Sequence, residues 1–441
     1  MGNEILAMFM FLGVFVGILA GFPVAFSLLG MAALFGIPAF GDALPAMLIR
    51  RVFTVSSNYV LAAVPFFVFM GVMLEKSGMA EKLFEAIKLW MGRFKGGLAL
   101  STIILCTIIA ASTGIIGASE VIVGLLALPV MLKSNYQKEL AVGTIIAGGA
   151  LGTIIPPSVV TVVYGPTAGV SVGRLLMATI IPGLLLSLLY AIYIIIRCQI
   201  NPSLGPASNE DRDVPLSHKL KITLVALVPP LVLIFSVLGS IVLGLAAPTE
   251  AAALGAFGTI VLAAGYRRLN WEVLKDALFQ TIKLTTMIML VLTAGNAYSG
   301  VFLGLGGGAA LEKAIMSLNL GSTGVLAVFL GIIFLGGFVL DWTSIILIFI
   351  PVFAPIVVKA GIDPVLFGTL VIMMIQTSYL TPPMAPGIFY VKGIAPPEVK
   401  DGHIFRGIIP YTCLQLLGIA TVVMFPKIAL WLPEVLLSNI K

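Results

Sequence analysis

The sequence predicts an all-α polytopic membrane protein, built as an inverted-topology repeat with two re-entrant helical hairpins and two broken helices. Three observations lead to this prediction. The 441-residue chain is 60% hydrophobic and 10% charged, whereas soluble proteins have about 45–50% apolar and about 25% charged residues. Its apolar runs are long enough for membrane helices and too long for barrel strands. Finally, two segments near opposite ends of the chain share one pattern.

The shared pattern is an apolar helical stretch interrupted by two prolines. One copy, 143–164, reads GTIIAGGALGTIIPPSVVTVVY, and the other, 368–390, reads GTLVIMMIQTSYLTPPMAPGIFY. Their Gly-Thr pairs lie 225 residues apart, and their Pro-Pro pairs lie 226 apart. Two interrupted membrane segments in corresponding halves of a chain indicate the binding site of a transporter.

Other matches extend the repeat over most of each half. Pro23 precedes Pro248 by 225 residues, and Ser119 precedes Ser344 by the same number. The polar stretch 201–220 is rich in Pro, Ser, Asn and Asp, which is typical of a linker. We therefore expect a first repeat over 1–198, a cytoplasmic linker over 199–220 and a second repeat over 221–441.

The apolar segments follow in the same order in both halves. In the first they lie near 4–20, 23–40, 59–75, 97–133, 139–171 and 174–198. In the second they lie near 221–245, 248–266, 284–305, 321–359, 363–391 and 404–432.

Segments 97–133 and 321–359 are too long for one span and short for two, because two crossings and a turn need roughly 40 residues or more. Each has a polar centre of small residues, 112–119 and 336–344. We interpret both as re-entrant hairpins; a pair of short ordinary spans is the alternative. With the hairpins not crossing, each half crosses five times, so the second half starts on the opposite face.

The basic residues orient this arrangement. Placing both termini on the non-cytoplasmic face of the membrane leaves seven of the 25 Lys and Arg residues outside: Arg50, Arg51, Arg174, Lys313, Lys359, Lys427 and Lys441. The positive-inside rule favours this orientation, with one hairpin entering from each face. The net charge of +6 therefore reflects membrane orientation and not nucleic-acid binding.

Two further segments, 81–95 and 270–283, have apolar residues at helical spacing opposite charged ones. Such helices lie in the membrane interface. They could link a fixed frame to a moving core, or they could be simple surface anchors.

A hairpin tip and a broken helix at similar depth offer hydroxyls and free carbonyls to a hard cation such as Na⁺, while the exposed helix N-termini suit an anion. We expect two or more Na⁺ ions, held by Ser112, Thr113, Ser119, Thr153 and Pro156 in the first half and by Asp341, Thr343, Ser344, Thr377, Ser378 and Thr381 in the second. The candidate substrate residues are Ser119, Ser158, Asp341, Thr343, Pro157 and Pro383. Any single hydroxyl here could instead serve helix packing.

Three carboxylates stand out. Asp341 lies in an apolar environment, where a charge is costly and indicates function; pairing with a basic residue is the structural alternative. Glu120 occupies a similar place in the first hairpin. Glu250 follows Pro248 at a helix start, so we interpret it first as a helix cap and second as a functional group.

Two other function classes have little support. The sequence offers no nucleophile–base pair or metal-ligand cluster for a membrane enzyme, and we do not expect one. It has no GxxxxGK[ST] phosphate loop for an ATP-driven pump.

Three segments resemble a known family. Residues 149–158 (GALGTIIPPS), 247–253 (APTEAAA) and 340–344 (LDWTS) are similar to the large, DctM-like membrane subunit of tripartite ATP-independent periplasmic (TRAP) transporters. The similarity in length and layout covers essentially the whole chain. The family pattern often has a second hydroxyl residue where this chain has Trp342.

The resemblance implies an ion-transporter-superfamily fold of the elevator type and Na⁺-driven symport of a small organic anion of the carboxylate class. It also implies two partners: a small four-helix membrane subunit and a periplasmic solute-binding protein. Segments 97–171 and 321–391 would form the transport core, and the other spans the scaffold. A stand-alone ion-coupled carrier or exchanger that needs no binding protein is the alternative.

Overall fold

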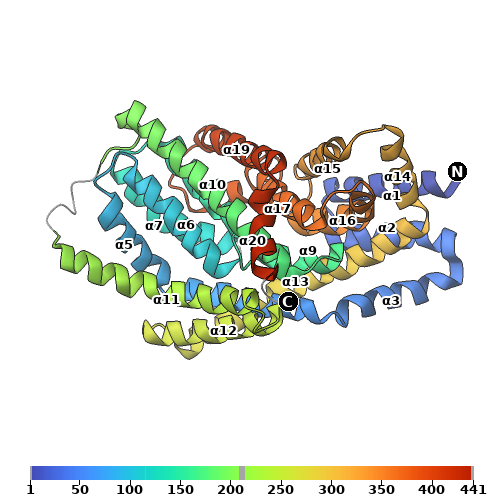
Figure 1. Cartoon of the computed structure of the whole chain (residues 1–441), viewed down its shortest axis with the longest axis horizontal. Coiled ribbons are helices and arrows are strands. Elements are labelled where there is room, and N and C mark those ends of the chain that lie inside the picture. The colour runs from blue at the N-terminus through green and yellow to red at the C-terminus, as the bar shows by residue number, and fades with distance from the viewer. Residues whose placement is uncertain (1, 115, 208–213, 439–441) are drawn as a thin grey trace.

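The computed structural model describes residues 2–114, 116–207 and 214–438, and it is built from helices (Figure 1). The helices before the linker are α1 Gly2–Leu19, α2 Val24–Phe40, α3 Leu44–Ser56, α4 Ala63–Lys76, α5 Met79–Met91, α6 Gly97–Thr113, α7 Ile116–Lys133, α8 Lys138–Ala150, α9 Val159–Ala168 and α10 Val172–Ile200. Short 3-10 turns η1 Gly41–Ala43, η2 Tyr59–Ala62, η3 Leu151–Thr153 and η4 Pro202–Leu204 connect or extend them.

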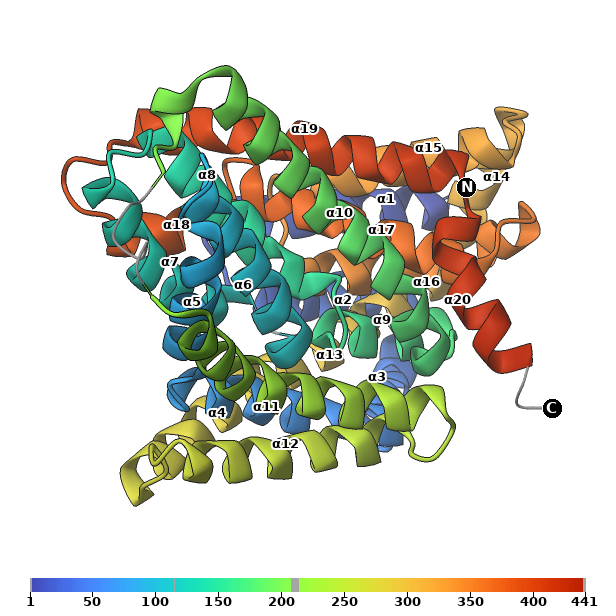
Figure 2. The same ribbon diagram turned by 60° about the vertical axis from the view of Figure 1, so that its left-hand side comes forward.

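The helices after the linker are α11 Leu216–Val242, α12 Pro248–Gly265, α13 Trp271–Gly304, α14 Gly307–Ser317, α15 Ser322–Gly336, α16 Trp342–Lys359, α17 Pro364–Leu380, α18 Pro386–Ile394, α19 Asp401–Met424 and α20 Lys427–Ser438. Helices α11 and α12 run side by side at one edge, and α19 crosses the opposite edge (Figure 2).

Both predicted hairpins consist of two short helices that pack against each other, α6 with α7 and α15 with α16. Their arms have 17, 18, 15 and 18 residues, or roughly 22–27 Å at 1.5 Å per residue, just under the thickness of a hydrocarbon core. Between the arms lie Gly114 in the first hairpin and residues 337–341 in the second.

Both predicted broken helices are interrupted at their Pro-Pro pair. Helix α8 ends at Ala150 and α9 begins at Val159, while α17 ends at Leu380 and α18 begins at Pro386. The prolines end the helices because they have no N–H to donate to the preceding turn. Both Pro-Pro peptide bonds are cis.

The contacts between the halves are reciprocal. Helix α7 packs on α18 and α16 packs on α9; α19 packs on α8 and α10 packs on α17; α12 packs on α4 and α2 packs on α13. In the repeat, α2 corresponds to α12, α4 to α13, α7 to α16, α8 to α17, α9 to α18 and α10 to α19. Replacing each helix by its counterpart turns every one of these contacts into another contact of the same set, as a pseudo-twofold axis requires.

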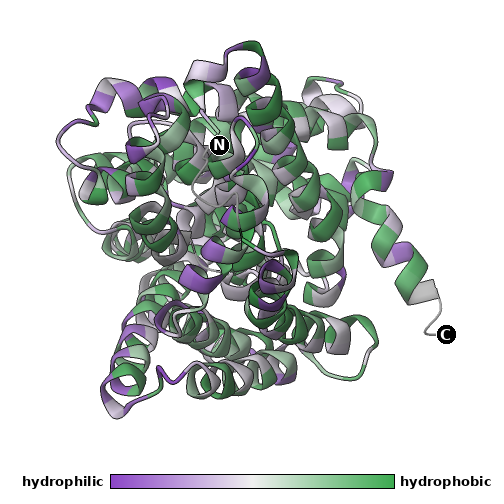
Figure 3. Cartoon of the chain, turned by 90° about the vertical axis from the view of Figure 1, so that its left-hand side faces the viewer, coloured by the Kyte–Doolittle hydropathy of each residue, from purple (hydrophilic) through white to green (hydrophobic). Residues whose placement is uncertain are grey.

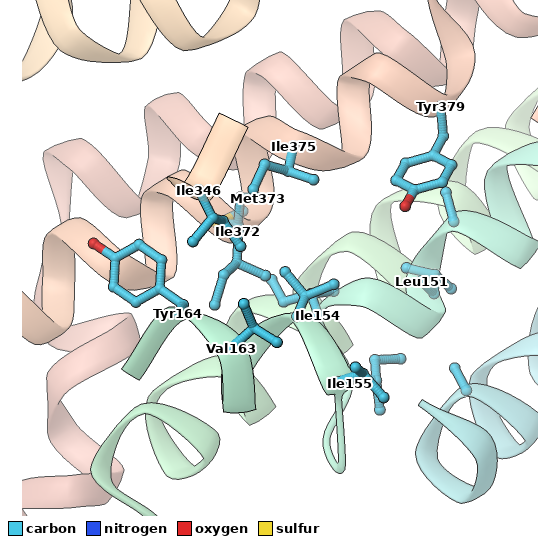
Figure 4. Close-up of a cluster of buried hydrophobic side chains, with 14 of the residues drawn as sticks. Leu151, Ile154, Ile155, Val163, Tyr164, Ile346, Ile372, Met373, Ile375 and Tyr379 are labelled. Carbon is cyan, nitrogen blue, oxygen red and sulfur yellow. The ribbon is translucent and has the colours of Figure 1, made fainter. Parts of the chain in front are cut away.

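The axis passes between the two broken helices. Counted back from the Pro-Pro pairs, Ala150 and Gln376 are equivalent positions, and Gln376 Nε2 donates a 3.1 Å hydrogen bond to the Ala150 carbonyl oxygen. Around this contact, Leu151, Ile154 and Val163 face Ile346, Ile372 and Ile375 in a buried apolar cluster (Figure 4).

The outer helices consist largely of hydrophobic residues, coloured green in Figure 3. Phe9, Phe26, Phe53, Phe235 and Phe257, from α1, α2, α3, α11 and α12, are each more than half exposed. Among the described residues, eight helical stretches are long and apolar enough to cross a membrane. The outer helices therefore expose apolar faces, as expected for a protein surrounded by lipid.

Four elements differ from the sequence prediction. Segment 270–283 is not a separate interfacial helix but the first part of the 34-residue helix α13, since no Gly or Pro interrupts the chain until 295. The apolar segment 404–432 is divided at Pro426 into α19 and α20. Helices α3 and α14 were not predicted. The segment 81–95 does contain a helix, α5, whose apolar side packs on α6 and α11.

Candidate functional site

The tip of the first hairpin lies against the break of the first broken helix. The Gly114 carbonyl oxygen accepts a 3.4 Å hydrogen bond from the Val159 N–H. Gly114 has a φ of +62°, and a β-carbon built on it would lie 2.1 Å from the Pro157 carbonyl oxygen. Only glycine fits this contact without displacement.

The hydroxyls predicted around this contact are all buried. Thr113 Oγ1 and Ser119 Oγ lie 3.0 Å apart, so the two arms of the hairpin share a hydrogen bond. Ser112 donates to the Ile108 carbonyl, Thr153 to the Ala150 carbonyl and Ser158 to the Thr153 carbonyl. Contacts at the tip thus join Thr113, Ser119, Thr153, Pro157 and Ser158 through Gly114 and two side-chain hydrogen bonds. Ser112 and Pro156, the chain neighbours of Thr113 and Pro157, are buried too.

The second half repeats the arrangement. The Met384 N–H donates a 3.1 Å hydrogen bond to the Phe338 carbonyl oxygen, which joins the second break to the second hairpin tip. A β-carbon on Gly337 would lie 2.9 Å from Ser378 Cβ. Thr377, Ser378 and Thr381 donate their hydroxyl protons to carbonyls of α17, one turn earlier.

Asp341 is the N-cap of α16. Its carboxylate accepts hydrogen bonds from the Thr343 N–H at 3.1 Å and the Ser344 N–H at 3.3 Å, and also from both hydroxyls of these residues. The three side chains therefore form one oxygen cluster at a helix start. Among the described residues, no ion pair is formed by Asp341, so the alternative of pairing with a basic residue has no support.

The Pro-Pro pairs leave carbonyl oxygens without their helical donors. Pro156 and Pro157 have no N–H for the carbonyls of Gly152 and Thr153, and Pro382 and Pro383 have none for Ser378 and Tyr379. The two breaks differ in exposure: Pro156 and Pro157 are buried, whereas Pro382 and Pro383 are exposed.

Two buried side chains near the breaks lay outside the predicted ligand sets. Glu120 is 1% exposed and Gln376 is fully buried. The sequence signal for Glu120 is its place beside Ser119 in the first hairpin. The signal for Gln376 is a single amide within an apolar run. Glu250 Oε2 accepts a 2.8 Å hydrogen bond from the Ala247 N–H at the start of α12, as the interpretation as a helix cap predicts.

Comparison with known proteins identifies the family. Residues 11–428 match the family described as tripartite ATP-independent periplasmic transporter, DctM component. The C4-dicarboxylate TRAP transporter large permease protein DctM of Pseudomonas aeruginosa is 30% identical, over 92% of this chain and 93% of its own. The ectoine/5-hydroxyectoine large permease protein UehC of Ruegeria pomeroyi is 30% identical, over 97% and 99%.

A third relative, the isethionate TRAP transporter permease protein DctMQ of Oleidesulfovibrio alaskensis, is 29% identical over 94% of this chain and 64% of its own. Among solved structures, the YdaH transporter of Alcanivorax borkumensis superposes with a TM-score of 0.64 at 17% identity, over 87% of this chain and 88% of its own. The MtrF structure from Neisseria gonorrhoeae has a TM-score of 0.63 at 12% identity, over 87% and 85%. The fold class predicted from the sequence is confirmed.

Proposed function

The chain belongs to the family of TRAP transporter large permeases, and on this premise we propose that it takes up a small organic anion by Na⁺-coupled symport. A periplasmic solute-binding protein would deliver the anion, and a small four-helix membrane subunit would complete the transporter. The observation that carries the proposal is the repeated contact of a hairpin tip with a broken helix, Gly114 with Val159 and Phe338 with Met384.

The residues at these contacts fit sodium ions. Na⁺ prefers oxygen ligands, and each tip combines hydroxyls with carbonyls freed by the prolines. We assign one ion to Ser112, Thr113, Ser119, Thr153 and the Pro156 break, and another to Asp341, Thr343, Ser344, Thr377, Ser378 and Thr381. When bound, each ion would supply positive charge between the tip and the break. The chain's own part is to hold these oxygens in place by helix capping and by hydrogen bonds to the preceding turn.

The substrate would lie between the two breaks. Helices α9 and α18 start there, and helix N-termini stabilise anions. We assign Ser119, Ser158, Asp341, Thr343, Pro157 and Pro383 to its surroundings. The names of the relatives include C4-dicarboxylates, ectoines and isethionate; a small carboxylate is the class that we propose for this chain.

Transport would follow an elevator mechanism, with residues 97–171 and 321–391 moving against the remaining spans. In this proposal the repeats 1–198 and 221–441 are joined by a cytoplasmic linker, predicted over 199–220. Helices α10 and α11 extend into that range, to Ile200 and from Leu216. Both termini would be periplasmic in the inner membrane. The ion pairs Lys76–Asp276, Lys392–Asp401 and Lys359–Glu312 support the predicted topology, because it places the two partners of each pair on one face.

The test is uptake into proteoliposomes that contain this chain, its small subunit and a loaded binding protein. We expect uptake to require all three components and an inward Na⁺ gradient. Uptake without the binding protein would contradict the tripartite proposal in favour of a stand-alone carrier. Uptake driven only by a proton gradient would remove the sodium sites.

A further inference from the structure

We propose that Glu120 of the first hairpin and the Tyr379 carbonyl oxygen of the second broken helix form an additional Na⁺ site, distinct from the two sites at the hairpin tips. This inference rests on the proposed cation-coupled function. The site would join the two halves of the chain, since Glu120 belongs to α7 and Tyr379 to α17.

The first observation is an uncompensated carboxylate. Glu120 is 1% exposed, and among the described residues neither of its carboxylate oxygens has a hydrogen-bond or ion-pair partner. A buried ionised carboxylate without a partner costs several kcal/mol or more. The start of α18 lies close by, but a helix N-terminus provides only about half a charge. A bound monovalent cation would neutralise the remaining negative charge of the Glu120 carboxylate.

The second observation is a free carbonyl oxygen beside this carboxylate. A β-carbon built on Gly387 would lie 2.8 Å from Glu120 Oε1 and 3.1 Å from the Tyr379 carbonyl oxygen, so both oxygens border the same small space. Pro383, four residues after Tyr379, has no N–H to donate to that carbonyl. A carboxylate and a free carbonyl are the hard oxygen ligands that a cation such as Na⁺ takes in membrane transporters.

The third observation is a second unpartnered acceptor, on α17, which lies against the same part of α8. Gln376 is fully buried; its Nε2 donates to the Ala150 carbonyl, whereas its Oε1 has no partner among the described residues. The side chain of Glu120 packs on the adjacent residue, since a β-carbon on Gly149 would lie 2.8 Å from Glu120 Cβ and Cγ. Consecutive residues of α8 therefore position both side chains.

Direct sodium binding tests the site without transport. Equilibrium binding of radioactive Na⁺ to the purified full-length chain would be compared for wild type, Glu120→Gln, Asp341→Asn and the double variant. Glutamine keeps the shape of the side chain and removes its charge. We expect Glu120→Gln to lose one bound ion per chain, or to weaken one binding step at least about tenfold. The double variant should lose one more ion than either single variant.

A matched pair of glycine variants tests the position. Gly387→Ala places a methyl group against both oxygens, whereas the methyl group of Gly393→Ala, on the same helix α18, meets nothing within 4 Å. Gly387→Ala should reproduce the loss seen with Glu120→Gln, and Gly393→Ala should bind Na⁺ as wild type does. Thermal unfolding in choline chloride checks that the variants are folded.

The outcomes separate this site from the function that it serves. If Glu120→Gln binds as many ions as wild type with unchanged affinity, the Glu120 site is wrong and the sodium-coupled function stands. If the wild-type chain itself binds no sodium, the sodium-coupled function fails as well.

Discussion

At the residue scale, Asp341 combines a structural role with a proposed functional one. It caps α16 through two backbone N–H groups, and it is the one carboxylate that we assign to the second sodium site. Because asparagine caps helices about as well as aspartate does, the two roles can be separated by substitution.

We expect Asp341→Asn to retain thermal stability and to abolish Na⁺-dependent uptake without affecting membrane insertion. Asp341→Ala should abolish uptake and also lose about 1 kcal/mol of stability, because the cap is removed. Asp363 is the matched control, since it caps α17 through Val365 and Leu366 outside the site. Asp363→Asn should transport normally; wild-type uptake by Asp341→Asn would remove Asp341 from the mechanism.

Gly114 gives a second prediction at this scale. Gly114→Ala brings a methyl group against the Pro157 carbonyl in a backbone conformation with positive φ. Gly169 has a similar φ of +69°, and a β-carbon built on it meets no atom within 4 Å. Gly169→Ala therefore measures the cost of the backbone strain alone. We expect Gly169→Ala to be mildly destabilised and Gly114→Ala to be destabilised more, because its β-carbon also meets the Pro157 carbonyl. Only Gly114→Ala should lose most uptake, because its hairpin tip no longer reaches the break. Equal uptake by the two variants would contradict a role for this contact.

The sequence could predict Asp341 because a carboxylate among apolar residues is conspicuous by itself. The environment of Glu120 could not be predicted in this way. It depends on Gly149 and Gly387, which lie 29 and 267 positions further along the chain and come close only through the packing of α7 against α8 and α18.

At the element scale, α8 and α19 cross with their backbones in contact. A β-carbon on Gly407 would lie 2.4 Å from the Glu139 carbonyl oxygen, and one on Gly143 would lie 2.2 Å from the Gly407 carbonyl oxygen. Small residues allow such close crossings in membrane helices.

We expect Gly407→Ala to lower the free energy of unfolding by about 1–3 kcal/mol, because the added methyl group separates the two helices. Gly402→Ala, on the same helix, meets nothing within 4 Å and should be neutral or slightly stabilising. Thermal unfolding of the purified variants in detergent measures the difference. A neutral Gly407→Ala would show that the crossing can relax.

Sequence patterns located the helices that a Pro-Pro pair or a polar centre interrupts. They failed at residue 283, where a helix boundary was predicted and helix α13 is continuous. The Pro-Pro pairs at 156–157 and 382–383 and the hairpin centres were found because each lies beside polar or small residues and recurs at a nearly constant spacing in the other half. Proline alone is not sufficient, since Pro229 and Pro230 lie inside the continuous helix α11. Helix α13 was divided at 283 on the basis of polarity alone, yet charged residues such as Lys275 and Lys283 are good helix formers and do not end a helix.

At the scale of the whole molecule, the predicted topology places Asp42 outside and Ser203 inside, and both residues are exposed. In a background with Cys413, the exposed native cysteine, replaced by serine, we expect Asp42→Cys to react with a membrane-impermeant maleimide in spheroplasts. Ser203→Cys should react only after the membrane is permeabilised. The reverse pattern would invert the orientation of the entire chain and exchange the faces from which the two hairpins enter.

The hydrogen bond between Gln376 and Ala150 has a consequence for the history of the chain. Before the duplicated halves were joined, a residue on their common axis would have met its own copy, so both partners had to be the same amino acid. An amide on one side and a small methyl side chain on the other require that the two halves differ in sequence, as they do in this chain. The two broken helices could then specialise separately, and their unequal exposure is one result that such a fusion permits.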